Sequence, residues 1–153
     1  MDEHGASIIE ILASVSILTT MIATGVPQTT ALWETFEGSK AVKQFVINVR
    51  RARIESLTAG TRGVLKVDVD ADGFSFGIDA APYSNPALSD YSVFRENLGE
   101  SITLNTSDTL IFDSRGFLVD VDGDPTTAAF SISVKGDLFA SGTISSSGRV
   151  DIN

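Results

Sequence analysis

The chain has 153 residues, enough for one compact domain with a modest core beyond any apolar segment. It carries 20 acidic and 11 basic side chains, and its net charge of −9 argues against a chain-wide surface for nucleic acid or anionic lipid. It has no cysteine and a single histidine, His4, which excludes disulfides and thiolate metal sites and removes the commonest catalytic bases and nucleophiles. The composition therefore argues against an enzyme.

The first strong feature is an apolar segment near the start of the chain. After the short polar run Met1–Gly5, the 21 residues 6–26 carry a single charge, on Glu10. A helix of this length spans about 30 Å, the thickness of a bilayer core. Six of these residues are Ser or Thr, small polar groups that favour close packing against other helices. Residues 6–27 are therefore predicted to form a hydrophobic helix that acts as a transmembrane and assembly segment.

An amphipathic helix is predicted to follow over residues 28–60. Pro27 disfavours a continuous helix through the turn before it, and Gly60 suits a helix C-cap. Together the two segments predict one long stem from about Ser7 to Thr58. Its second half carries apolar residues at three- and four-residue steps, which form a stripe for core or helix packing: Trp33, Phe36, Val42, Phe45, Val46, Val49 and Ala52.

From residue 61 to residue 153 the pattern becomes that of β-strands. Alternating apolar residues at 64–69 and 74–78 flank an Asp-Ala-Asp-Gly turn, which predicts a hairpin. The predicted fold class is α+β: a long N-terminal helix packed on an antiparallel β-sheet or small β-sandwich head. Turn signals separate the further predicted strands, which lie near residues 91–94, 101–104, 109–112, 117–121, 129–134, 138–144 and 149–152.

Glu10 is the most informative residue, because a carboxylate inside an apolar helix needs compensation. Its burial in hydrocarbon costs about 3 kcal/mol or more. A cut after Gly5 would create a new amine on Ala6, close to Glu10 in the sequence. That amine, from the same or a neighbouring subunit, could pair with the carboxylate and set the axial register of adjacent helices.

The run Gly5-Ala6-Ser7-Ile8-Ile9-Glu10 resembles the class III signal of type IV prepilins and type II secretion pseudopilins. The resemblance implies a prepilin peptidase that cuts after Gly5 and methylates Ala6, which makes residues 1–5 a leader. It also implies that Glu10, the fifth mature residue, pairs with a neighbour's amine. Pro27 falls where such stems commonly carry a proline, and it joins Glu10 as an assembly residue.

Later segments resemble one branch of this family, the GspH/FimT-like minor pseudopilins. Residues 50–60 and the strand after them look like the helix-to-strand junction of that branch. Leu110–Gly116 is similar to its internal F-x-x-x-G strand and turn, and Gly148–Ile152 to its closing strand. The resemblance covers most of the chain and implies a pilin-like fold.

Three charged clusters could each be a ligand site or an ordinary solvent-exposed part of the surface. Asp68, Asp70, Asp72 and Asp79 imitate the spacing of a calcium loop, but flanking strands favour a solvated hairpin turn, so calcium is a weak candidate and no other cofactor is expected. Asp120, Asp122 and Asp124 look like another turn. Lys40, Lys43, Arg50, Arg51 and Arg53 could form a basic strip for DNA. The FimT-like branch linked to DNA uptake carries several basic residues near its C-terminus. Val150 and Asp151 break that branch's basic pattern after Arg149, which favours a solvated helix face.

The resemblance thus implies a minor pilin or pseudopilin that assembles through its N-terminal helix into a type IV pilus or type II secretion pseudopilus, at the tip. Its expected partners are other pilin or pseudopilin subunits, the prepilin peptidase and, before assembly, the bacterial inner membrane, with the head in the periplasm. Two alternatives remain: a DNA-binding minor pilin for DNA uptake, and a major pilin.

Overall fold

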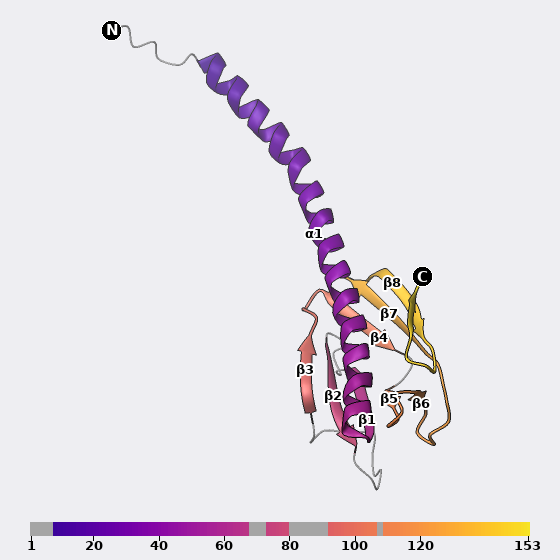
Figure 1. Cartoon of the computed structure of the whole chain (residues 1–153). Coiled ribbons are helices and arrows are strands. Elements are labelled where there is room, and N and C mark those ends of the chain that lie inside the picture. The colour runs from indigo at the N-terminus through magenta and orange to yellow at the C-terminus, as the bar shows by residue number, and fades with distance from the viewer. Residues whose placement is uncertain (1–7, 68–72, 80–91, 107–108) are drawn as a thin grey trace. The chain divides into compact units, whose positions relative to one another are not determined.

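A computed structural model describes residues 8–67, 73–79, 92–106 and 109–153. These residues form one long helix, α1 (Ile8–Ala59), and the regular elements that follow it are all β-strands (Figure 1). The strands are β1 (Arg62–Val67), β2 (Gly73–Asp79), β3 (Ser92–Asn97), β4 (Ile102–Thr106), β5 (Leu110–Phe112), β6 (Leu118–Val119), β7 (Ala128–Val134), β8 (Asp137–Ile144) and β9 (Val150–Ile152). Every strand predicted from the sequence is present, with ends shifted by a few residues.

The chain divides into two compact units, residues 1–36 and residues 37–153. The helix α1 runs through both, and the backbone stays helical across residues 24–28. The interruption that Pro27 favours therefore does not occur. A proline inside a helix costs about 3 kcal/mol, and a helix of 52 residues retains most of its hydrogen-bond ladder around that defect.

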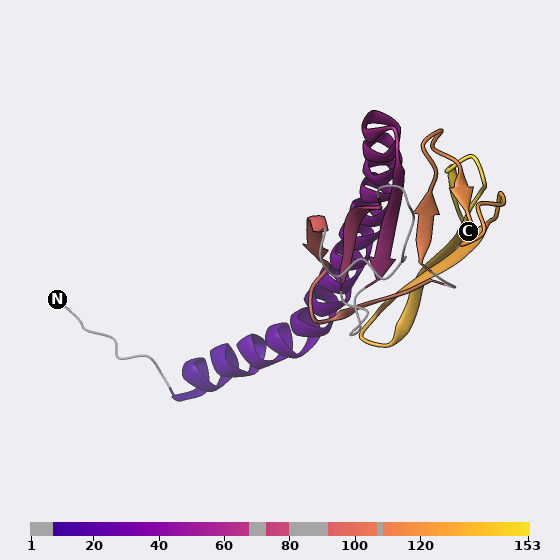
Figure 2. The same ribbon diagram turned by 90° about the horizontal axis from the view of Figure 1, so that it is seen from below.

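The second unit contains two antiparallel sheets beside the C-terminal half of α1 (Figure 1, Figure 2). One sheet has the order β3-β2-β1-β5-β6, and the other has the order β4-β7-β8-β9. The predicted hairpin is confirmed: β1 and β2 pair antiparallel, from Arg62 opposite Asp79 to Val67 opposite Phe74. Its connecting residues, 68–72, lie outside the described part of the chain.

One hydrophobic cluster joins the helix to both sheets. The α1 residues Ala41, Phe45, Val49 and Ala52 recur at steps of three and four, and all are almost completely buried. The Phe45 ring lies 6.0 Å from Phe74 of β2 and 4.9 Å from Phe130 of β7, measured between ring centroids. The α+β fold class predicted from the sequence, a helix packed on antiparallel strands, is confirmed.

The helix ends in a tight cap at Gly60. Gly60 has a positive φ of 63°, and its N–H donates to the Leu57 carbonyl, while the Thr61 N–H donates to the Ser56 carbonyl. These two bonds form a Schellman motif, which satisfies carbonyls at the end of the helix. The C-cap predicted at Gly60 is therefore confirmed, and β1 begins two residues later.

Candidate assembly interface

The N-terminal unit exposes apolar side chains around the whole helix. Among its described residues, Ile8 and Ile9 are 76% and 77% exposed, and neighbouring positions on every side of the helix are also apolar. The other large exposed apolar side chains of this unit are Ile11, Leu12, Val15, Ile17, Leu18, Met21, Ile22, Leu32, Trp33 and Phe36. A continuous apolar surface of this kind marks a site of contact with protein or lipid.

Trp33 and Phe36 extend this surface toward the second unit. They are 64% and 62% exposed, and their rings lie 6.1 Å apart. The sequence placed them, with Phe45, in one stripe for core or helix packing. Phe45 is in the core, but Trp33 and Phe36 are not, because the core residues of α1 begin at Ala41.

Hydroxyl groups in this helix hydrogen-bond to the helix itself. Each donates to a backbone carbonyl about one turn earlier, so neither the hydroxyl hydrogen nor the helix ladder requires an outside partner. The bonds run from Ser14 to Glu10, from Ser16 to Leu12 and from Thr19 to Val15, at 2.8, 2.8 and 2.6 Å. The Ser and Thr residues therefore lower the cost of burying this helix in an apolar interface.

The Glu10 carboxylate lies in the first turn of α1 and is exposed. It forms no ion pair or side-chain hydrogen bond with any residue in the described part of the chain. Its position near a helix N-terminus is electrostatically favourable, because the helix dipole presents partial positive charge there. Gly5 and Ala6, the predicted processing residues, lie outside the described residues, so their relation to Glu10 stays a prediction.

Among the described helical residues, no stretch combines the length and the hydropathy that a membrane crossing requires. The transmembrane segment predicted over residues 6–27 is thus not supported.

The candidate calcium ligands fall mostly outside the described residues. Asp68, Asp70 and Asp72 lie in the connection that the structure does not describe. Asp79, at the end of β2, is buried, and its Oδ2 atom has no hydrogen-bond partner. Within the described ranges, no three His, Cys, Asp or Glu side chains come close enough to hold a metal ion.

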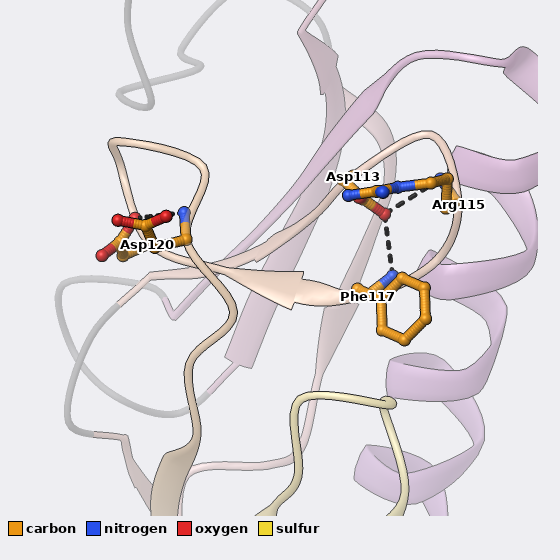
Figure 3. A network of polar contacts seen from close by, with 5 residues as sticks. Asp113, Arg115, Phe117 and Asp120 are labelled. Atoms are coloured by element: carbon orange, nitrogen blue, oxygen red, sulfur yellow. Dashed lines mark hydrogen bonds and ion pairs between the residues drawn. The ribbon is translucent and has the colours of Figure 1, made fainter.

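The F-x-x-x-G segment forms a rigid turn between β5 and β6. The Asp113 Oδ1 atom accepts hydrogen bonds from the Arg115 and Phe117 N–H groups at 2.9 and 2.8 Å, and Oδ2 pairs with the Arg115 guanidinium at 2.8 Å (Figure 3). Burial raises the pKa of Asp113, but hydrogen bonds from Phe117 and Arg115 outweigh it, so the pKa lies below its usual 3.8. Gly116 has a φ of 77°, which only glycine adopts without strain.

The five basic residues that the sequence placed in one strip are separated by the structure. Arg50 and Arg53 line a groove beside the β8–β9 turn, together with Arg149. Arg51 instead lies over the Phe94 ring, 4.4 Å from its centroid, and approaches Glu55 at 4.0 Å. Lys43 is exposed on another part of α1. Arg149 lies 90 residues beyond the end of α1 in the sequence, and only the sheet topology brings it to the helix.

Solved structures provide close matches to this architecture. The type IV minor pilin FimU of Pseudomonas aeruginosa aligns with a TM-score of 0.58 and 20% identity, over 76% of this chain and 88% of FimU. The minor pseudopilin EpsH from the type II secretion system of Vibrio cholerae aligns with a TM-score of 0.57 and 15% identity, over 78% of this chain and 97% of EpsH. The chain has a type IV pilin-like fold.

The pilin-like fold is also shared with GspH of E. coli, at a TM-score of 0.53 and 9% identity over 78% of this chain and 89% of GspH. No protein-family model matches the sequence, and no curated protein does so either. At these identities the likeness concerns the fold. The pilin-like and GspH-like resemblance drawn from the sequence is therefore confirmed at the level of the fold.

Proposed function

We propose that this chain is a minor pilin or pseudopilin subunit that assembles into a filament through the N-terminal half of α1. The observation that carries the proposal is the apolar, all-round exposed helix on a pilin-like head. FimU and EpsH are both described as minor subunits, one of a type IV pilus system and the other of type II secretion. A scarce subunit at the filament tip is the role that we propose for this chain.

Apolar burial would supply most of the adhesion. Burying one large aliphatic side chain contributes about 1.5–3 kcal/mol. Residues 8–22 alone present nine large apolar side chains that are more than half exposed. Even partial burial of these side chains against neighbouring helices offsets the entropy lost when subunits associate. Their hydroxyl-bearing neighbours already satisfy their own donors, as described above.

Glu10 would set the axial register between the helices of neighbouring subunits. Apolar packing alone permits helices to slide along one another, because many offsets bury similar areas. A single charge pair between Glu10 and the amine of Ala6, exposed by cleavage after Gly5, selects one offset. Charge-assisted hydrogen bonds of this kind contribute about 1.5–3 kcal/mol, and each 1.4 kcal/mol is a factor of ten in affinity.

Before assembly, the proposal places the precursor in the bacterial inner membrane with its head in the periplasm. There the prepilin peptidase would cut after Gly5 and methylate Ala6. Extraction of membranes at alkaline pH tests this stage, because an anchored precursor remains in the pellet. Mass measurement of the mature protein tests the processing: a chain that begins at methylated Ala6 supports the proposal, and a functional chain that still begins at Met1 refutes it.

The assembly test compares the Glu10→Gln variant with a matched control, Glu100→Gln. Glu100 is exposed on the head, and its replacement changes the net charge by the same amount. Incorporation is measured as the amount of each variant in sheared filaments, relative to its amount in the cell. We expect about tenfold less incorporation for Glu10→Gln and no change for Glu100→Gln. Equal incorporation of the two variants would remove the register role of Glu10.

A further inference from the structure

A groove lies between the C-terminal part of α1 and the turn that joins β8 to β9. Its volume is about 550 Å³. Three arginines and three aliphatic residues line it: Arg50, Arg53, Arg149, Ile54, Leu57 and Val150. All of these residues belong to the second unit, so the groove is independent of the N-terminal assembly helix.

Two glycine turns lie beside the Arg53 side chain in this groove. Gly116 and Gly148 have φ values of 77° and 74°, and each turn passes so close to Arg53 that a side chain would crowd it. A β-carbon at position 116 would lie 3.0 Å from Arg53 Nε, and one at position 148 would lie 3.0 Å from Arg53 Cδ. The Arg53 side chain therefore passes close to the backbone of both turns.

The groove also contains positive charge that no carboxylate among the described residues neutralises. The Arg53 Nε atom is buried and has no hydrogen-bond partner. Neither Arg50 nor Arg53 forms an ion pair with any residue that the structure describes. Arg149 pairs with Asp151 at 2.7 Å, which leaves two of the three guanidiniums unpaired. Because neither guanidinium has a carboxylate partner among the described residues, an anion in this groove would compensate their charge.

The aliphatic part of the lining decides which kind of anion fits. Ile54 and Leu57 are 59% and 45% exposed, although both are large and apolar. Nucleic acid binding favours aromatic platforms or long basic tracks, and the lining contains neither. An acidic side chain next to an aliphatic one matches both halves of the groove.

We propose that this groove binds a short acidic peptide segment of a partner protein. Its carboxylate forms a forked hydrogen-bonded pair with Arg53, with Arg50 nearby, and its aliphatic side chain covers Ile54 and Leu57. This inference goes beyond assembly through the N-terminal helix and does not depend on it, because no residue of the first unit takes part.

The test uses the full-length chain in detergent micelles and isothermal titration with the acetylated, amidated peptide Leu-Asp-Leu-Asp-Leu. The uncharged peptide Leu-Asn-Leu-Asn-Leu is the ligand control, and empty micelles supply the blank. We expect the acidic peptide to bind at least tenfold more tightly than the uncharged one. We also expect Arg53→Gln and Arg50→Gln each to weaken binding about tenfold. Arg50 is exposed, so its replacement leaves the fold intact.

The matched control variant is Lys43→Gln, which removes one exposed positive charge from the same helix outside the groove. Its binding should stay within twofold of the parent chain. The proposal is overturned if the parent chain binds neither peptide, or if it binds both equally. It is also overturned if Lys43→Gln weakens binding as much as Arg53→Gln. Tighter binding of a single-stranded oligonucleotide, lost in Arg53→Gln, would assign the groove to nucleic acid instead.

Discussion

Replacing Phe45 with alanine removes the side chain that connects α1 to both sheets. The Phe45 side chain is completely buried, and its ring contacts Phe74 from the five-stranded sheet and Phe130 from the four-stranded sheet. The substitution therefore leaves a cavity where three elements meet. Because each wall of that cavity belongs to a different element, the surrounding side chains can close it only partly.

The expected cost follows from that geometry. Phenylalanine-to-alanine substitutions in cores cost about 3–5 kcal/mol, which includes lost transfer free energy and the remaining cavity. Two aromatic contacts are lost as well, each worth about 0.5–1.5 kcal/mol, which favours the upper part of that range. With a urea dependence of about 2 kcal/mol per molar, the midpoint of unfolding should fall by about 2 M.

The assay is pulse proteolysis of the full-length chain in detergent over a urea series, which reports the fraction of unfolded head. Phe45→Leu, which keeps most of the volume, should show a much smaller decrease. Ile47→Ala is the matched control, since Ile47 is on the same helix but is 60% exposed, and surface changes usually stay within about 0.5 kcal/mol. A Phe45→Ala midpoint equal to that of Ile47→Ala would refute the helix-to-sheet packing described here.

Two further predictions concern the helix-to-strand junction and the β5–β6 turn. Gly63→Ala should destabilise the head by about 1–3 kcal/mol, because a β-carbon there would overlap Ser56 Oγ and lie 2.7 Å from the Phe76 ring. The same proteolysis assay tests this prediction, and an unchanged urea midpoint would contradict the close approach. Asp113→Asn should destabilise the head at pH 7. The pKa of Asp113 is lowered in the fold, so its charge stabilises above the unfolded value of about 3.8, and this contribution is lost as pH falls through the lower, folded pKa. Variant and parent should therefore converge in stability at the lowest pH, and a constant difference would show that the charge of Asp113 is irrelevant.

Much of the fold could be predicted because local patterns and tertiary structure agree. Alternation in β1 and β2, with Gly73 at the start of β2, specified a hairpin that the register confirms. Gly60 specified the end of the helix, since its positive φ follows from glycine's lack of a β-carbon. In each case the signal lies within a few residues of the structure that it determines.

The rest depends on contacts between distant parts of the chain. Trp33, Phe36 and Phe45 share one helical periodicity, yet only Phe45 is buried, because periodicity cannot tell where along a helix the packing begins. No sequence pattern predicted that Arg53 and Arg149 line the same groove, because their proximity arises from the position of the β8–β9 turn. Glu10 was singled out through its apolar surroundings, while Ala6, whose amine is its predicted partner, lies outside the described residues.

The direct connection of α1 to β1 has a mechanical consequence. Traction along the C-terminal half of the helix passes through the Gly60 cap into β1, which is the central strand of its sheet. Six residue pairs hold β1 to β2 on one side, and three hold it to β5 on the other. Extracting β1 requires both ladders to shear together, so the head resists tension through a strand that is held on both sides.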